Sequence, residues 1–460
     1  MKGMEKMMWG GRFDKKPISE VLKFNSAENI ELDQHLIFYD AVGSIAHVKM
    51  LGKTGIIKKE ECEDITRALI SFIKSTNEKT GALKLEYEDV HMNVEVAVTA
   101  ITPHGKKMHT ARSRNDQVLL DMRMYMRSNI IALGKSIVEL QKSFETLAKK
   151  DGVMVAYTHT RVAQPITLSF WSDSVVKSLY RDLERLLQAY KRVNQNPLGA
   201  GAIAGTSWPI DRNYTAKLLG FEGVQENELD TINSRGECES EILAIVSILM
   251  NKVSGIAEEL IWLSQKGLVQ IPAEFCTGSS MMPNKKNPDV LEIIRGRTVR
   301  VQSNFYHALG VKKGLMTGYN SDLQETKYAI MSGIQTTIGC LDILQKLIPD
   351  LVFDQKEIAT ELEKGYAQAT EIADSLARKG VPFREAHERV GKLVKDCEGQ
   401  GIGLSNTAAF PEFSRKEWED AVSLKRSRLE RKVVVDKGYG KMLDDEEARI
   451  EKAYQNLIAK

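Results

Sequence analysis

Three stretches of this chain carry apolar residues at alternating steps of three and four, and this periodicity limits the possible folds more than any other feature. The stretches run from Leu119 to Leu147, from Val176 to Val193 and from Ile242 to Leu263. Steps that average about 3.5 residues are typical of long helices packed side by side at shallow angles. The first helix, expected from about Ser113 to Lys149, would be roughly 55 Å long at about 1.5 Å per residue.

The central part of the chain is therefore expected to be a bundle of long helices. Two more helices are expected near Val290–Leu309 and Lys327–Leu347, and no alternation of period two is flanked by hairpin turns. The sequence predicts an all-α fold with three helical domains, over residues 1–110, 111–353 (the long-helix bundle) and 354–460. Because helices of this length would leave apolar stripes uncovered in one chain, we expect copies of the chain to bury them.

Charge and cysteine content exclude several classes of protein. The 460 residues include 64 basic and 62 acidic ones, a formal net charge of +2, which gives no support for binding nucleic acid or a membrane surface. The five cysteines are scattered without a Cys-x-x-Cys pair, which favours reduced thiols and a cytoplasmic location. No cluster has metal-ligand spacing, no glycine-rich nucleotide loop follows a strand, and no apolar run reaches about 18 residues. We expect no metal, no cofactor and no membrane span.

A constrained polar loop separates two of the expected helices. Residues 278–288 read Gly-Ser-Ser-Met-Met-Pro-Asn-Lys-Lys-Asn-Pro, and Pro283 and Pro288 restrict the backbone. Pro288 suits the first position of the next helix, whose N-terminus would direct N–H groups and positive partial charge toward the loop. Together with the serines, Lys285 and Asn287, that helix start makes a site for carboxylates with a candidate proton acceptor beside it.

Two other polar stretches precede long helices, and each admits two interpretations. Residues 109–117 include Arg114 and Asn115, which suit an anionic ligand at a helix start. A capped helix with a charged first turn explains the same residues. Residues 157–165 include His159, which can act as a general acid or base near neutral pH. A single histidine is more often structural.

Two further features complete the set. Glu292 follows Pro288 by four residues and can orient a histidine, or it can be a solvated glutamate that favours the helix dipole. Residues 319–327 are dense in hydrogen-bond donors, as a helix-start loop would also be. Since antiparallel helices bring their ends together, we expect all of these stretches to lie at the tips of the bundle.

The loop at 278–288 meets every fixed position of the pattern Gly-Ser-Ser-x-Met-Pro-x-Lys-x-Asn-Pro, and it resembles the signature loop of the fumarase/aspartase superfamily. Five stretches together resemble the argininosuccinate lyase family: Trp9–Phe13, His109–Gln117, Tyr157–Pro165, Gly278–Pro288 and Tyr319–Lys327. The resemblance extends to about Gly401. It implies an all-helical homotetramer with a central twenty-helix bundle and active sites built from three subunits each. The implied reaction is the reversible elimination of argininosuccinate to arginine and fumarate, without metal or cofactor.

The same resemblance implies the roles of individual residues. Ser279 would remove a proton from the carbon beside a carboxylate, and Lys285 would stabilise the carbanion. His159, oriented by Glu292, would protonate the departing guanidino nitrogen, although the roles of Ser279 and His159 can also be exchanged. The implied substrate-binding residues are Asn115, Thr158, Asn287, Tyr319, Gln324, Lys327, Arg114 and His91.

The chain departs from the family pattern at two places, and two alternatives stay open. Asn29 stands four residues before Asp33, where the family usually has a substrate-contacting serine, and Ser26 is displaced. Beyond Ser405 the family's usual Gly-Gly-Thr stretch is missing. The alternatives are another lyase of the superfamily, such as adenylosuccinate lyase, and a catalytically silent structural protein that resembles the delta-crystallins. The intact reactive residues favour an enzyme.

Overall fold

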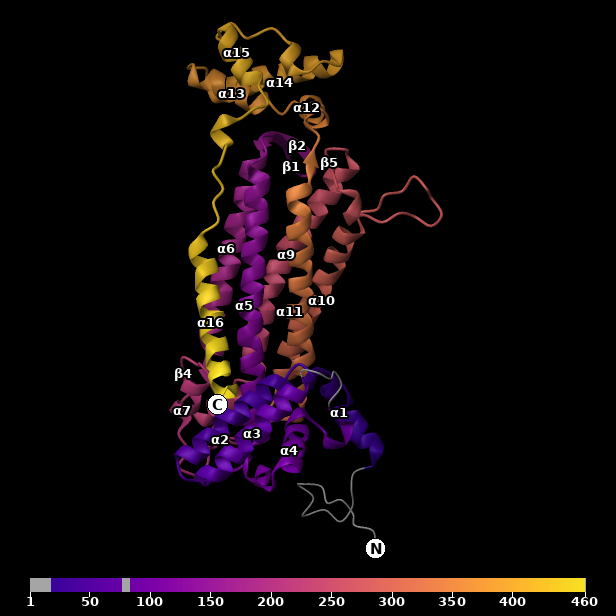
Figure 1. Cartoon of the computed structure of the whole chain (residues 1–460). Helices are drawn as coiled ribbons and strands as arrows, with labels where there is room; N and C mark the ends of the chain where they lie inside the picture. The colour runs from indigo at the N-terminus through magenta and orange to yellow at the C-terminus, as the bar shows by residue number, and fades with distance from the viewer. Residues whose placement is uncertain (1–17, 77–82, 460) are drawn as a thin grey trace.

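A computed structural model describes residues 18–76 and 83–459, so the Trp9–Phe13 stretch lies outside the described residues. Five long helices stand side by side as a bundle (Figure 1). Their bounds are α5 Arg114–Ala148, α6 Leu168–Val193, α9 Glu237–Gln265, α10 Asp289–Lys312 and α11 Thr326–Leu347. The expected all-α fold is thereby confirmed, and so are the two additional helices.

The apolar stripes explain why these helices pack together. All the stripe residues of α5, α6 and α9 are buried within the single chain, so the expectation that copies of the chain must cover these three stripes is wrong. Other elements of the same chain, including α2 and α16 against α5, help to enclose them. The exposed apolar side chains lie elsewhere, and on α10 they include Ile293, Val299 and Tyr306, which are 50%, 61% and 70% exposed.

Shorter helices gather at the end of the bundle where α5 begins (Figure 1). They are α1 Ser19–Asp33, α2 Ile37–Lys53, α3 Lys59–Thr76 and α4 Val90–Ile101, with 3₁₀ turns at Leu85–Tyr87 and Pro103–Lys107. Asp89 is the N-cap of α4, and its carboxylate accepts a hydrogen bond from the Met92 N–H at 2.8 Å. This cap fixes the start of the helix that carries His91.

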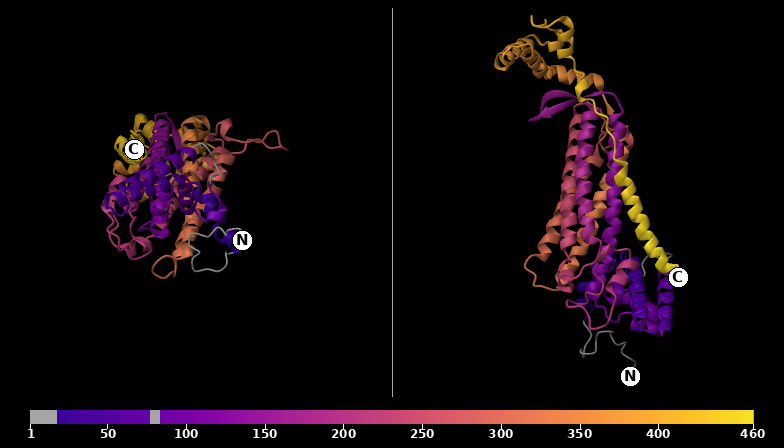
Figure 2. Two further views of the ribbon diagram at one scale, coloured as in Figure 1. Left: turned by 60° about the horizontal axis from the view of Figure 1, so that its bottom comes forward. Right: turned by 90° about the vertical axis from the view of Figure 1, so that its left-hand side faces the viewer.

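A β-hairpin joins α5 to α6, so the expectation that the chain has no hairpin is wrong. Strands β1 Val153–Thr158 and β2 Arg161–Thr167 pair antiparallel, and Figure 2 shows the hairpin at the far end of the bundle from the N-terminal helices. The remaining connecting elements are short: β3 Gln195–Asn196, α7 Arg212–Leu218, β4 Gly223–Val224, α8 Glu228–Asn233, β5 Val269–Gln270, β6 Val352–Phe353 and 3₁₀ turns at Ala273–Phe275, Ser321–Glu325 and Ile348–Asp350.

The C-terminal part of the chain contributes to two separate cores. The elements after the bundle are α12 Gln355–Lys364, α13 Ala369–Arg378, α14 Phe383–Gln400, α15 Arg415–Val422, α16 Lys437–Ile458 and 3₁₀ turns at Leu404–Asn406 and Ser427–Leu429. Helices α13–α15 enclose a small core of their own. Helix α16 returns along the bundle (Figure 2) and buries Leu443, Ile450 and Tyr454 in the main core. The domain division at 110/111 and 353/354 stays a prediction.

Helix α9 is the one helix in the described part of the chain that is long and apolar enough to cross a membrane. In this structure it packs against α6, α10 and α11 as an inner member of the bundle. Its stripe residues from Ile242 to Leu263 are buried in these contacts, whereas Ile248 and Trp262 are exposed.

Candidate active site

A cavity of about 630 Å³ opens where the first turns of α5 and α11 meet the N-terminal helices. Six of the predicted substrate-binding residues line it: His91, Arg114, Asn115, Tyr319, Gln324 and Lys327. Ser26 and Asn29 line it as well, so both candidates for the displaced serine contact face the same space. These residues come from segments at 26–29, 91, 114–115 and 319–327, which the bundle and the N-terminal helices bring together.

Asp33, the last residue of α1, connects α11 and α4 beside this cavity. Its carboxylate lies 2.7 Å from the Lys327 ammonium and accepts a hydrogen bond from the Val90 N–H at 3.1 Å. Asp33 is fully buried and Lys327 is 2% exposed. A buried ion pair of this kind holds its geometry firmly, because separating the charges would leave each of them without compensation.

The start of α5 is fixed by Asp116. Its carboxylate accepts the Ser113 N–H in a capping box and the N–H groups of Gly199 and Gly201, each at 2.9 Å. Burial raises the pKa of Asp116 to about 6. These bonds hold the neighbouring Asn115 at the cavity, where its carboxamide donates to the Ala202 carbonyl at 3.4 Å.

Arg235 is a cavity residue that the sequence analysis missed. It is 2% exposed, and it donates from Nη2 to Oε1 of Gln324 at 2.9 Å, while Gln324 donates from Nε2 to the Tyr319 hydroxyl at 3.0 Å. Burial lowers the pKa of Arg235. A lone arginine beside Gly236 gives no signal in the sequence, because its partners lie more than 80 positions away.

Thr158 and His159 lie at the tip of the hairpin, at the opposite end of the bundle from the cavity. His159 and Thr160 have φ values of 50° and 61°, and the flanking Thr158 and Arg161 are paired. Two consecutive positive φ values make a tight two-residue turn of the type that matches strand twist. The turn leaves the His159 side chain exposed.

The 278–288 loop projects from the side of the bundle near the hairpin end (Figure 1). Thr277 and Asn287 close its base through two backbone hydrogen bonds of 3.1 and 2.8 Å. The Ser279 hydroxyl accepts the N–H groups of Met281 and Met282 at 3.3 and 3.0 Å. Ser279 is half-buried and Lys285 is exposed on this loop.

Helix α10 begins at Asp289, so Pro288 stands one position before the helix rather than in its first turn. Glu292 is exposed in the first turn of α10. In the described part of this one chain it makes no recorded contact with His159, although the two were expected to pair. That contact stays a prediction.

The predicted site residues therefore form two groups at opposite ends of the chain. Helix α5 has 35 residues, which at about 1.5 Å each separate its two ends by about 50 Å. The cavity lies at its start and the hairpin with His159 follows its end. The expectation that all the polar stretches meet at the tips of the bundle holds for the cavity residues. One chain does not bring the hairpin tip or the projecting 278–288 loop to that cavity (Figure 1).

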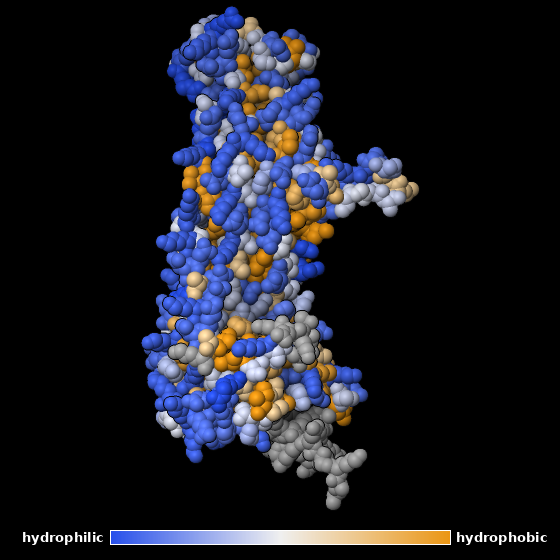
Figure 3. Space-filling model, viewed as in Figure 1, coloured by the Kyte–Doolittle hydropathy of each residue, from blue (hydrophilic) through white to orange (hydrophobic). Residues whose placement is uncertain are grey.

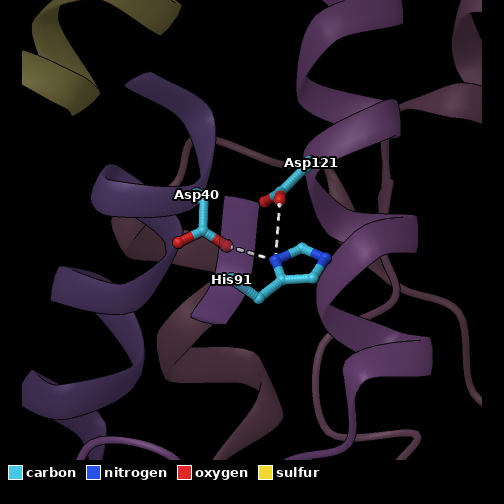
Figure 4. A group of neighbouring side chains, drawn as sticks. All are labelled: Asp40, His91 and Asp121. Atoms are coloured by element: carbon cyan, nitrogen blue, oxygen red, sulfur yellow. Dashed lines mark hydrogen bonds and ion pairs between the residues drawn. The ribbon is translucent and has the colours of Figure 1, made fainter. Parts of the chain in front are cut away.

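A buried Asp–His–Asp cluster behind the cavity was also missed (Figure 4). The Nδ1 atom of His91 lies 2.5 Å from Asp40 Oδ2 and 3.5 Å from Asp121 Oδ2. The residues come from α4, α2 and α5, and their possible ligand atoms all lie within 4.8 Å of one another. Spacing in sequence could not reveal the cluster, since its members stand on three different helices.

Comparison with known proteins identifies the family. The model described as "Lyase" matches residues 15–303, and the model described as "Argininosuccinate lyase C-terminal" matches residues 366–431. The second match continues past Ser405, where the sequence departs from the usual family pattern.

Curated relatives and solved structures agree with these matches. The argininosuccinate lyase of Anoxybacillus flavithermus is 43% identical over 87% of this chain and 88% of its own length. That of Acetivibrio thermocellus is 40% identical over 90% of this chain and 89% of its own. An EDDS lyase solved in complex with formate shares 26% identity and a TM-score of 0.76 over 97% of this chain and 93% of its own. A class II fumarase from Schistosoma mansoni, 13% identical, shares the fold with a TM-score of 0.73 over 85% of this chain and 90% of its own. This chain belongs to the argininosuccinate lyase family of the fumarase/aspartase superfamily of lyases.

Proposed function

We propose that this protein is a cytoplasmic enzyme of arginine biosynthesis that converts argininosuccinate reversibly to arginine and fumarate. The observation that carries the proposal is the identity of 40–43% over about nine-tenths of the chain to relatives with this one name. The intact 278–288 loop supports catalysis over a silent structural role. The C-terminal family match favours argininosuccinate over adenylosuccinate as the substrate.

The proposed chemistry begins with removal of a proton from the carbon next to a carboxylate of the substrate. Ser279 is the proposed base, and the charge that spreads onto the carboxylate is stabilised by Lys285, by the Asn287 carboxamide and by the N–H groups at the start of α10. His159, oriented by Glu292, then protonates the guanidino nitrogen as the carbon–nitrogen bond breaks. No step requires a metal or an organic cofactor.

The remaining predicted residues are proposed to bind the substrate. Those of the cavity are His91, Arg114, Asn115, Tyr319, Gln324 and Lys327, and Thr158 and Asn287 would join them from other copies of the chain. The mixture of cationic and amide groups suits a substrate with several carboxylates and a guanidino group.

The proposed active unit is a homotetramer with shared sites. The separation of about 50 Å between the ends of α5 supports sharing, because the cavity and His159 can act on one substrate only if they come from different chains. The exposed apolar residues of α10 support an interface between copies. Figure 3 shows apolar side chains along the bundle below the base of the projecting loop. Four copies of this five-helix bundle would contain the twenty helices that the family resemblance implies.

The direct test is incubation with argininosuccinate while fumarate absorbance and free arginine are followed. Both products should appear in equal amounts, and Ser279→Ala should lower kcat by about 10²-fold or more with substrate binding nearly unchanged. Adenylosuccinate serves as the control substrate. Release of a purine nucleotide from adenylosuccinate, with no arginine from argininosuccinate, would replace the proposed substrate. Absence of turnover with either substrate would favour the silent structural protein.

Mixed tetramers test whether the sites are shared. His159→Asn and Asn115→Ala affect opposite ends of the bundle, so two inactive variants that are unfolded and reassembled together should regain activity. The family resemblance implies that His159 and Ser279 of one site come from different subunits, so the mixture of His159→Asn with Ser279→Ala should regain activity as well. The matched control is Asn115→Ala with Gln324→Ala. Both residues line the cavity of the same chain, so every cavity in that mixture keeps a defect. No recovery in the first two mixtures, with mixed tetramers confirmed by mass, would reject shared sites.

A further inference from the structure

His91 connects the cavity to a pair of buried carboxyl groups. Its side chain lines the cavity and is 5% exposed. Figure 4 shows Nδ1 turned toward Asp40 and Asp121, and Nε2 turned away from both. Among the described residues no hydrogen-bond partner is recorded for Nε2, while Nδ1 lies at hydrogen-bond distance from Asp40. The imidazole ring of His91 is therefore held at Nδ1 by Asp40, and its Nε2 is available to the cavity.

The two carboxyl groups face very different surroundings. Asp40 Oδ2 accepts from His91 and from Gln117 Nε2 at 2.8 Å. Both oxygens of Asp121 are buried, and no hydrogen-bond donor to them is recorded among the described residues. Two neighbouring carboxylates in a dry site repel each other, so ionisation of both is unfavourable.

The charges around the pair favour ionisation of Asp40 rather than Asp121. Burial, and then the charge of Asp40, raise the pKa of Asp121 well above its usual range. Burial also acts to raise the pKa of Asp40, but His91, Arg112 and the bonds to its oxygen lower it below its usual value. The Arg112 guanidinium is the nearby positive charge and is itself held by the Ser44 hydroxyl at 3.0 Å.

We propose that Asp40 and Asp121 are positioning residues that share one negative charge and orient His91, whose Nε2 contacts the substrate in the cavity. Asp121 stays neutral and can donate a hydrogen bond to the Asp40 carboxylate. Asp40 accepts a hydrogen bond from the protonated Nδ1 of His91. This bond fixes both the tautomer and the direction of the ring. The proposal rests on the function proposed above and adds two residues to it.

A metal ion in the same cluster fits less well. An ion bound to both His91 and Asp40 would take bonds of about 2.0–2.2 Å to each. That would hold the nitrogen and the oxygen apart, whereas they lie 2.5 Å from each other and share a hydrogen. The contact between His91 Nδ1 and Asp40 Oδ2 therefore fits a hydrogen bond better than a shared metal ion.

Paired variants test this assignment. Asp121→Asn replaces a neutral acid by an amide of the same shape that can still donate, so kcat/KM should fall much less than it does in Asp40→Asn. Asp40→Asn removes the charge-assisted bond to His91 and should raise KM by about 10- to 100-fold, with a smaller change in kcat. In a His91→Gln background, Asp40→Asn should have little further effect, because Asp40 acts through His91.

A structural role alone would give a different pattern. Equal losses in Asp121→Asn and Asp40→Asn, or an undiminished effect of Asp40→Asn without His91, would overturn the proposal. So would a stoichiometric bound metal that Asp121→Asn releases. Crystal structures of the variants add a readout that does not depend on activity: the ring of His91 should keep its direction in Asp121→Asn and turn in Asp40→Asn. A wild-type protein that leaves argininosuccinate unchanged would count against the proposed function, and the ring orientation would still test the inference.

Discussion

His47 should make the protein less stable in mild acid, by an amount that the structure allows us to work out. Its side chain is fully buried, and Nε2 lies 2.8 Å from the Thr110 carbonyl oxygen. That oxygen can only accept, so Nε2 carries the proton and donates. Burial, followed by the charge of Arg112, lowers the pKa of His47 to about 3. The folded protein therefore keeps this histidine neutral across the whole range of mildly acidic pH.

The sign of the effect follows from the two pKa values. An unfolded histidine takes up a proton near pH 6.5, while folded His47 stays neutral down to about pH 3. Between these values the unfolded state binds more protons, so stability is fully present above about pH 6.5 and falls as the pH is lowered. At pH 5.5, about one unit below the unfolded pKa, the loss from this one residue is about 1.4 kcal/mol.

His47→Gln tests this number, since glutamine can still donate to the Thr110 carbonyl but does not titrate. Urea unfolding followed by circular dichroism at pH 7.5 and 5.5, at one protein concentration, gives the change in unfolding free energy for each protein. The wild type should lose about 1.4 kcal/mol more than the variant over this interval. His109, whose pKa burial lowers to about 4, contributes in both proteins and cancels. An equal pH dependence in the two proteins would refute the reasoning.

Three further predictions follow from the same contacts. Lys327→Met should destabilise the fold by about 3–5 kcal/mol, because Asp33 then stays buried without its partner, and adding Asp33→Asn should restore part of the loss in urea unfolding. Exhaustive chelation should leave activity unchanged, whereas loss and recovery with an added metal ion would contradict the cofactor-free mechanism. Light scattering at micromolar concentration should give a mass of about four times the 51.6 kDa of one chain, and a monomer mass would contradict the shared-site proposal.

The long helices could be predicted from sequence because their evidence is local. The apolar period fixed α5 to within one residue of its observed ends, and Ser113 caps it as its position suggested. The hairpin could not be predicted in the same way. Its turn consists of His159 and Thr160 in left-handed conformations, where Gly, Asn or Asp would normally give the signal. Pairing along the two strands holds these residues in a conformation that their own preferences disfavour.

The buried acidic residues behind the cavity could not be predicted from sequence for a different reason. Asp40 and Asp121 stand on the helices α2 and α5, and a charged residue on a helix is ordinarily expected to be exposed. Their burial depends on partners that lie on other helices, such as His91 at 51 positions from Asp40. Only the packing of α2, α4 and α5 reveals that the three side chains face each other. Residue types and spacing indicated the candidate reactive groups, and the tertiary structure was needed to show which buried side chains contact them.

The length of α5 links the stability of the fold to the reaction that the protein is proposed to catalyse. A helix with its start fixed by Asp116 and with buried residues from Val118 to Leu147 cannot bend enough to bring its ends together. The cavity at its first turn and the hairpin after its last turn are therefore held apart by a rigid spacer. If both ends act on one substrate, the second end must be supplied by another copy of the chain that runs in the opposite direction. On this view the exposed position of His159 and the half-buried position of Ser279 are properties of the single chain, and each proposed reactive group gains its surroundings only when the copies assemble.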